Sequence, residues 1–133
     1  MAVEVGAVVK QVSESTSEGS ARGHRVLCDR PGTKGGSDGG AMGGELFLIG
    51  LGGCFLSNLL AAIKARNAEI ADVVVHLTAL LDGTPARFTE ISLDVSGSFS
   101  DREEMEKLVL IAERGCIVAN TIKDAVALSV GVK

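Results

Sequence analysis

The apolar residues of this chain gather around one long run that carries no charge. Between Glu45 and Lys64 lie 18 residues without a charged side chain. A helix that is apolar on nearly all sides is typical of a buried element. Over Glu45–Arg66 such a helix would be about 33 Å long, which is roughly the diameter of a small domain. We therefore expect it to be the central element, with a second subunit completing its burial.

A transmembrane segment is the alternative interpretation of the same run, because about 18 apolar residues reach the threshold for a membrane span. However, several glycines, Ser57 and Asn58 dilute the run. Its ends also lack the aromatic anchors and the cluster of basic residues that flank membrane helices. We therefore expect a core helix and no membrane association.

Two strands and two irregular segments are predicted before this helix. Ala2–Val12 is rich in valine and suits a strand, whereas Ser13–Gly23 is small and polar and is typical of a turn or hairpin loop. His24–Cys28 predicts a short second strand. Gly32–Gly44 is rich in glycine and predicts a loop, with close backbone approach where a partner covers it and mobility where none does. It lacks the G-x-x-x-x-G-K-[ST] pattern of a phosphate-binding loop.

A strand hairpin is predicted after the helix. Val73–Leu81 is strongly apolar, which predicts burial on both faces. Phe88–Phe99 alternates between apolar and polar residues with a period of two, the mark of a half-buried strand. The short turn between the two strands predicts antiparallel pairing.

Two helices and a strand complete the expected order. Ser100 and Glu103 form the S-x-x-E pattern of a capping box, which predicts a helix that ends at Gly115. Ile117–Lys123 is expected to be a short helix and Ala125–Val132 the last strand. This order predicts an α+β fold with largely antiparallel pairing, in a single domain over residues 1–133.

Composition narrows the range of functions. The chain has 133 residues, 46% of them hydrophobic, a net charge of −4 and neither Trp nor Tyr. The chain therefore lacks the excess of basic residues that neutralises phosphates and most of the aromatic residues that stack on bases. We expect no nucleic-acid partner. The first residues lack the basic and apolar regions of a secretory signal. Three cysteines without such a signal indicate a reducing compartment, so we expect a cytoplasmic protein.

The three cysteines differ in what their positions allow. Cys28 is interpreted as a packing residue, because free cysteines are among the most buried residue types. Cys54 lies too deep in its helix for the N-terminal dipole to lower its pKa, so a reactive Cys54 would need a donor from elsewhere. Cys116 follows the end of one helix and precedes the next. The spacing of 62 residues between Cys54 and Cys116 fits neither a C-x-x-C motif nor a zinc site. It leaves two interpretations open, two packing residues or a redox pair. His24 and His76 are isolated, so no metal is expected.

A family resemblance favours the redox pair. The segments GHRVLCDRP, GGSDGG and GELFLIGLGGCF, in that order, and ERGCIV around Cys116, resemble the osmotically inducible protein C / organic hydroperoxide resistance (OsmC/Ohr) family, in its OsmC-like branch. The likeness covers nearly the whole chain in the same order of elements, and the two cysteines are its most specific part. The chain differs from the family pattern in having Gly43 and Ile117 where prolines are usual, and in placing Glu45 one residue closer to Cys54.

The resemblance implies a fold and an activity. The expected fold is OsmC-like, an antiparallel curved sheet packed on a long central helix in an intertwined homodimer. The expected activity is that of a thiol peroxidase without cofactor, which reduces alkyl or lipid hydroperoxides in oxidative stress defence. A dithiol reductant, such as a lipoyl protein or another thiol donor, would restore the enzyme. A non-enzymatic dimer that binds a small apolar ligand or senses redox state is the alternative.

Site residues follow by position in the family pattern. Cys54 is expected to be the peroxidatic cysteine and Cys116 the resolving one. Arg22, with Arg25 as the second choice, is expected to stabilise the thiolate, and Glu45 to orient the arginine. The apolar residues expected to contact substrate around Cys54 are Phe47, Leu51 and Phe55.

Overall fold

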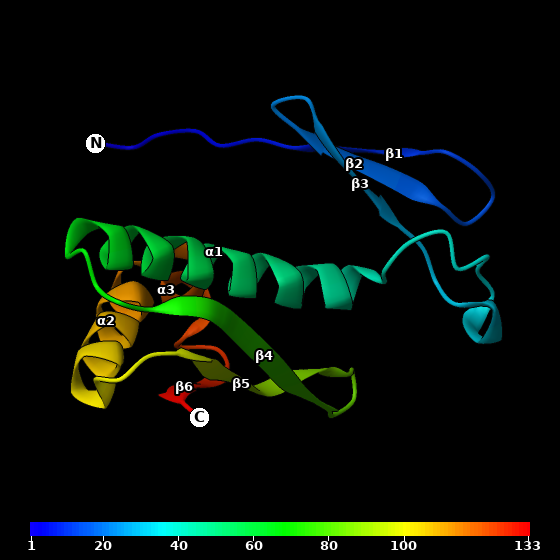
Figure 1. Ribbon diagram of the computed structural model, residues 1–133. Helices are drawn as coiled ribbons and strands as arrows, with labels where there is room; N and C mark the ends of the chain where they lie inside the picture. The colour runs from blue at the N-terminus through cyan, green and yellow to red at the C-terminus, as the bar shows by residue number, and fades with distance from the viewer. The chain divides into compact units, whose positions relative to one another are not determined.

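A computed structural model describes all residues from Met1 to Lys133 and shows an α+β fold with one long central helix (Figure 1). The chain divides into two compact units, residues 1–47 and 48–133. The expectation of a single domain over the whole chain stays a prediction. The elements are β1 (Val8–Gln11), β2 (Ser17–Ala21), β3 (His24–Cys28), a 3₁₀ turn (Gly32–Lys34), α1 (Gly43–Ala65), β4 (Ala71–Asp82), β5 (Arg87–Ser98), α2 (Arg102–Gly115), α3 (Ile117–Ile122) and β6 (Ala127–Val132).

The first unit is built on an antiparallel sheet in the order β1-β2-β3. The expectation of a loop over Ser13–Gly23 was wrong, because β2 lies inside it and the first strand is shorter than Ala2–Val12. β2 has the sequence SEGSA, whose small or charged residues have weak strand propensity, and it is held by hydrogen-bond ladders to both neighbouring strands. Arg22 and Gly23 form the tight turn to β3, both with positive φ, as in the hairpin turns that match strand twist.

Asp29 organises the glycine-rich loop that follows β3. Its side chain is 3% exposed, and its carboxylate accepts five hydrogen bonds at 2.7–3.2 Å from the segments around it. The N–H of Gly39, together with the Thr16 hydroxyl and the N–H of Arg30, holds the pKa of Asp29 well below its usual range against the opposing effect of burial. The charged form of this side chain therefore fastens the loop to the end of the sheet.

Two glycines let this loop approach the preceding backbone. A Cβ atom at Gly36 would lie 1.9 Å from the carbonyl oxygen of Arg30, and one at Gly40 would lie 2.4 Å from that of Leu27. No side chain fits at either position, since the opposing atoms are backbone. Of the two roles that the composition left open for the loop, close backbone approach is confirmed.

The second unit packs helices against a three-stranded sheet in the order β4-β5-β6. β4 and β5 are antiparallel, as the hairpin pattern predicts, whereas β6 pairs with β5 in parallel. A parallel neighbour requires a crossover connection, and α2 with α3 provides it. The predicted period of β5 is confirmed, since Ile91, Leu93 and Val95 are buried between exposed or half-buried polar residues. Burial of β4 on both faces was wrong, because every second residue from Val74 to Leu80 is exposed.

The central helix α1 is buried along one stripe only. That stripe consists of Leu51, Gly52, Phe55, Leu59 and Ala62. By length and composition α1 could also cross a membrane, and 28% of its most apolar 18-residue window is buried in the single chain. Apolar side chains on its other faces, such as Ile49 and Leu60, are exposed. Their burial by a second subunit stays a prediction.

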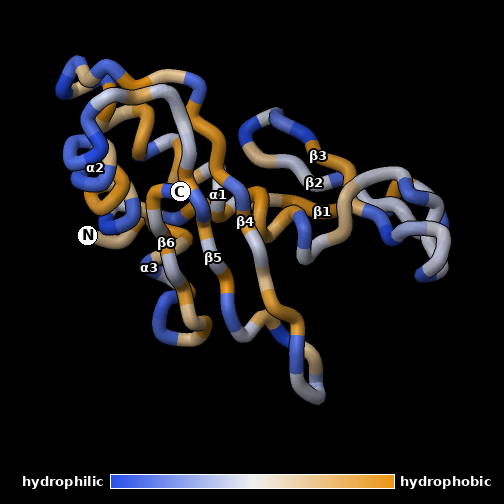
Figure 2. Tube along the Cα trace, turned by 60° about the horizontal axis from the view of Figure 1, so that its bottom comes forward, coloured by the Kyte–Doolittle hydropathy of each residue, from blue (hydrophilic) through white to orange (hydrophobic).

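The cap of α2 lies one residue later than the sequence pattern predicts. Asp101, not Ser100, is the N-cap residue, and its carboxylate accepts a hydrogen bond of 3.1 Å from the N–H of Glu104. The serine and aspartate both suit a cap, so the pattern S-x-x-E and the pattern D-x-x-E compete in this segment. Hydrophilic and hydrophobic residues occupy opposite sides of the helix (Figure 2).

Removing this cap is expected to weaken α2. Asp101→Ala should lower the free energy of unfolding by about 0.5–2 kcal/mol, because one N–H of the first turn loses its acceptor. Urea unfolding followed by circular dichroism measures the change. Ser100→Ala is the matched control and should leave the unfolding midpoint unchanged; a larger effect from Ser100 than from Asp101 would contradict the observed cap.

Candidate active site

The fold brings two of the three cysteines together inside the second unit. Cys54 lies on α1, and Cys116 lies at the junction between α2 and α3. The Cys116 thiol donates a hydrogen bond to the sulfur of Cys54. Cys28 belongs to the first unit and ends β3, and all three thiols are free. Two thiols in hydrogen-bond contact are close to the geometry from which a disulfide forms after a small movement.

The junction between α2 and α3 fixes the position of Cys116. α2 ends at Gly115, and the backbone of Cys116 turns to an extended conformation with φ −78° and ψ 111°. Its sulfur then accepts a hydrogen bond of 3.4 Å from the N–H of Ala119, so the thiol itself caps α3. The side chain is fully buried. Cys54 is half-buried, which makes it the more accessible of the two sulfurs.

The surroundings of the two thiols favour ionisation of Cys54. Burial raises the pKa of the Cys54 thiol, but hydrogen bonds from the N–H of Val118, the thiol of Cys116 and the N–H of Ile117 outweigh it, and the pKa lies below the usual value. Burial also raises the pKa of Cys116; the N–H of Ala119 opposes this, and the neighbouring charge of Cys54 adds to it, so the pKa of Cys116 lies above the usual value. Of the two thiols, Cys54 is therefore the one that ionises more readily.

The main-chain donors of α3 are functional groups that sequence reasoning missed. The deep position of Cys54 on α1 led to the expectation that it needs a guanidinium or another donor from elsewhere. The N–H groups of Val118 and Ile117 reach its sulfur and are such donors. The side chain of Ile117 is 70% exposed, so the backbone and not the side chain serves the site. A predicted short helix after Cys116 was the available signal, but the sequence does not show toward which residue its first N–H groups point.

Arg22, Arg25 and Glu45 lie in the first unit, and each has a defined local setting. Arg22 occupies the exposed turn between β2 and β3. Arg25 lies on β3 and forms an exposed ion pair of 4.0 Å with Glu18. The carboxylate of Glu45 accepts a hydrogen bond of 2.9 Å from the N–H of Met42, which is half of a capping box at the start of α1. Their service to Cys54 stays a prediction.

The three expected substrate-contact residues differ in exposure. Leu51 and Phe55 are fully buried and belong to the core cluster that Cys54 packs against. Phe47 is 39% exposed at the start of α1. Leu51 and Phe55 thus belong to the buried core on which Cys54 packs. Direct contact with a substrate stays a prediction for all three residues.

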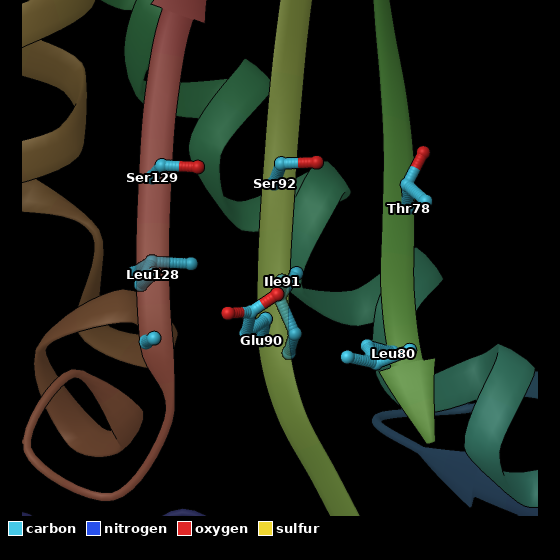
Figure 3. Close-up of a pocket in the computed structure, with 8 residues that line it drawn as sticks. Thr78, Leu80, Glu90, Ile91, Ser92, Leu128 and Ser129 are labelled. Carbon is cyan, nitrogen blue, oxygen red and sulfur yellow. The ribbon is translucent and has the colours of Figure 1, made fainter. Parts of the chain in front are cut away.

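A hollow of about 410 Å³ with polar and apolar lining residues lies on the outer face of the second sheet (Figure 3). Thr78, Ser92 and Ser129 stand side by side across β4, β5 and β6, as the strand register requires. The core residues of β5 point to the opposite face. The hollow is therefore separated from the thiol pair by the sheet. No group of three or more His, Cys, Asp or Glu side chains is placed to hold a metal ion.

Comparison with known proteins identifies the family. No curated protein matches the sequence. Among solved structures, an OsmC-like protein from Mycoplasma pneumoniae is similar with a TM-score of 0.86 and 18% identity, over 100% of this chain and 98% of that one. An organic hydroperoxide resistance protein OsmC from Legionella pneumophila has a TM-score of 0.75 and 22% identity, over 98% and 97%. The organic hydroperoxide resistance protein OhrB of Bacillus subtilis has a TM-score of 0.69 and 20% identity, over 98% and 98%.

These structural likenesses show a common fold. The family described as OsmC-like protein matches residues 35–131, a segment that contains α1, Cys54, Cys116 and the second sheet except for its last residue, Val132. Because that match covers most of the sequence, the chain belongs to the OsmC-like protein family.

Proposed function

We propose that this protein is a thiol peroxidase that reduces organic hydroperoxides in defence against oxidative stress. The observation that carries the proposal is the thiol pair, in which Cys116 donates a hydrogen bond to Cys54 and the two pKa values move in opposite directions. A peroxidase needs one ionised, accessible sulfur and one protonated sulfur beside it. Membership of the family and the names of two structural neighbours support the same chemistry.

The first step oxidises Cys54. Its thiolate attacks the terminal oxygen of the hydroperoxide, a sulfur–oxygen bond forms, the oxygen–oxygen bond breaks, and the leaving alkoxide takes up a proton to become an alcohol. Cys54 is then a sulfenic acid. The main-chain donors of Ile117 and Val118 stabilise the thiolate before attack. Arg22, oriented by Glu45, is proposed to add a positive charge for the developing negative charge on oxygen.

The second step joins the two sulfurs. The thiol of Cys116 gives up its proton and attacks the sulfur of the Cys54 sulfenic acid, a disulfide forms, and the hydroxyl group leaves as water. The hydroperoxide has gained two electrons, and the two cysteines have lost them. A dithiol from outside the protein reduces the disulfide by exchange through a mixed disulfide.

Apolar surroundings favour organic hydroperoxides as substrates. Cys54 packs against a core cluster that contains Leu51 and Phe55, and Phe47 adds an aromatic side chain at the start of the same helix.

A homodimer is part of the proposal, because Ile49 and Leu60 of α1 and Val9 of β1 leave apolar surface exposed in the single chain. Sedimentation velocity of the full chain tests this, and a monomer at micromolar concentration would contradict it.

Thiol counting tests the proposed chemistry. One equivalent of tert-butyl hydroperoxide should consume two of the three thiols and lower the mass by two hydrogen atoms, with Cys28 remaining free. Peptide mapping should show a link between Cys54 and Cys116. Hydrogen peroxide at the same concentration should react more slowly. Three intact thiols after organic hydroperoxide treatment would contradict the peroxidase and favour the non-enzymatic alternative.

A further inference from the structure

Asn58 is a polar residue on the apolar helix α1, one turn beyond Cys54. Residues four apart on a helix lie on the same face, so the Asn58 amide and the Cys54 thiol point to the same side. Its Nδ2 donates a hydrogen bond of 3.5 Å to the carbonyl oxygen of Ala112 in α2. α2 and α3 lie against the C-terminal half of α1 (Figure 1). Two contacts on neighbouring turns of α1 therefore reach the same helix junction, one through Cys54 and one through Asn58.

The end of α2 explains why Ala112 needs this partner. In a continuing helix its carbonyl would accept from the N–H of residue 116. Here the N–H of Cys116 bonds to the carbonyl of Glu113 instead, at 3.2 Å, because the helix tightens and ends. Carbonyls of a last helical turn need donor partners from outside the helix ladder. Because the N–H of Cys116 no longer bonds to the carbonyl of Ala112, the Asn58 amide supplies a donor to that carbonyl.

Packing places the same amide beside the residue that precedes Cys116. A Cβ atom at Gly115 would lie 3.6 Å from Nδ2 of Asn58, an ordinary contact distance. The amide thus bonds to α2 at Ala112 and lies beside the space next to Gly115 that a side chain there would enter. Asn58 follows Cys54 by four residues on α1, and its amide lies near Gly115, the residue that precedes Cys116.

We propose that Asn58 is a positioning residue for disulfide formation, which ties the last turn of α2 to α1 and so sets the approach of the Cys116 sulfur to Cys54. This inference rests on the proposed function. The sulfurs must come from hydrogen-bond contact to a bond of about 2.05 Å, with alignment along the sulfur–oxygen bond that breaks. A misplacement of about 1 Å is enough to slow such a step strongly. Asn58 touches neither reacting atom, so it acts through the placement of Cys116.

Separating the two oxidation steps tests this role. In a Cys28→Ser background, Asn58→Leu and Asn58→Ala both remove the donor, the first by filling and the second by emptying the space. After a pulse of tert-butyl hydroperoxide, sulfenic acid trapping measures the first step, and loss of the Cys116 thiol measures closure. We expect closure to slow about tenfold or more in both variants, with the first step changed less than twofold. Asn58→Gln, which retains an amide donor, should recover part of the rate, and Ser57→Ala should be neutral.

A second assay needs no peroxide. Ellman's reagent forms a mixed disulfide at the accessible Cys54, and Cys116 then displaces the second thionitrobenzoate as the intrachain disulfide closes. The Asn58 variants should release this second equivalent about tenfold more slowly than the Cys28→Ser parent. Closure at the parental rate, or both oxidation steps slowing in equal proportion, would overturn the positioning role. A parent that closes in this assay but ignores hydroperoxide would reject the proposed function and leave the role of Asn58 standing.

Discussion

Cys54→Ser is expected to abolish hydroperoxide turnover. The serine hydroxyl stays protonated under conditions in which the Cys54 thiolate forms, and the donors from α3 then have no anion to stabilise. Loss of the nucleophile should lower kcat/KM about a thousandfold or more. A steady-state assay with tert-butyl hydroperoxide and dithiothreitol measures the effect, with unfolding midpoints recorded to show that the variant is folded.

The other two cysteines supply the controls for this result. Cys28→Ser should retain full turnover, because the proposed reaction uses only the sulfurs of Cys54 and Cys116. Cys116→Ser should retain the first oxidation and accumulate a sulfenic acid that a dimedone reagent captures. Equal turnover by the unsubstituted protein and the Cys54→Ser variant would reject the catalytic role of Cys54.

Phe55→Ala is expected to cause the largest loss of stability. Phe55 is 1% exposed in the core between α1 and the second sheet, and removing its ring leaves a cavity that the surroundings fill only in part. Such substitutions cost about 3–5 kcal/mol, a large part of the roughly 5–15 kcal/mol that a domain has. Urea unfolding at constant protein concentration measures the change.

Comparison with Phe47 separates packing from substrate contact. Phe47→Ala should cost much less stability, since its ring is partly exposed. If Phe47 contacts the hydroperoxide, the variant should raise KM for a bulky aromatic hydroperoxide more than for tert-butyl hydroperoxide. Phe55→Leu, which keeps most of the buried volume, should lose less than half of what Phe55→Ala loses. An equal loss from both substitutions at Phe55 would contradict the cavity argument.

Apolar periodicity, together with capping and glycine signals, predicted the order of the elements in the second unit. The alternation in Phe88–Phe99 places Ile91, Leu93 and Val95 in the core, where the structure has them. For β4 the apolar sequence predicted burial on both faces, but one face is exposed and carries Val74 and Leu80. Pairing of β6 with β5 in parallel is a property of the three-dimensional arrangement, and the pattern of a single strand does not contain it.

The site shows a similar division between what sequence predicts and what folding adds. The proximity of Cys54 and Cys116 followed from the family resemblance, since a spacing of 62 residues left the pair undecided. The donors from Ile117 and Val118 are backbone groups, which carry no sequence signature. Asp29 was likewise missed as an organiser, because its partners come from three separate segments that only the fold unites.

The crossover between β5 and β6 limits how the proposed disulfide between Cys54 and Cys116 could be reduced. Cys116 lies in the connection that joins β5 to β6, two adjacent strands that pair over Glu90–Val95 and Ala127–Val132. A connection held at both ends moves less than a chain terminus would. The sulfur of Cys116 therefore stays buried, whereas the half-buried sulfur of Cys54 on α1 is accessible to solvent. If the proposed disulfide forms, we expect an incoming reductant to attack it at Cys54 and to release Cys116 as the leaving thiol. The Cys116 sulfur can then again accept the hydrogen bond from the N–H of Ala119 and cap α3.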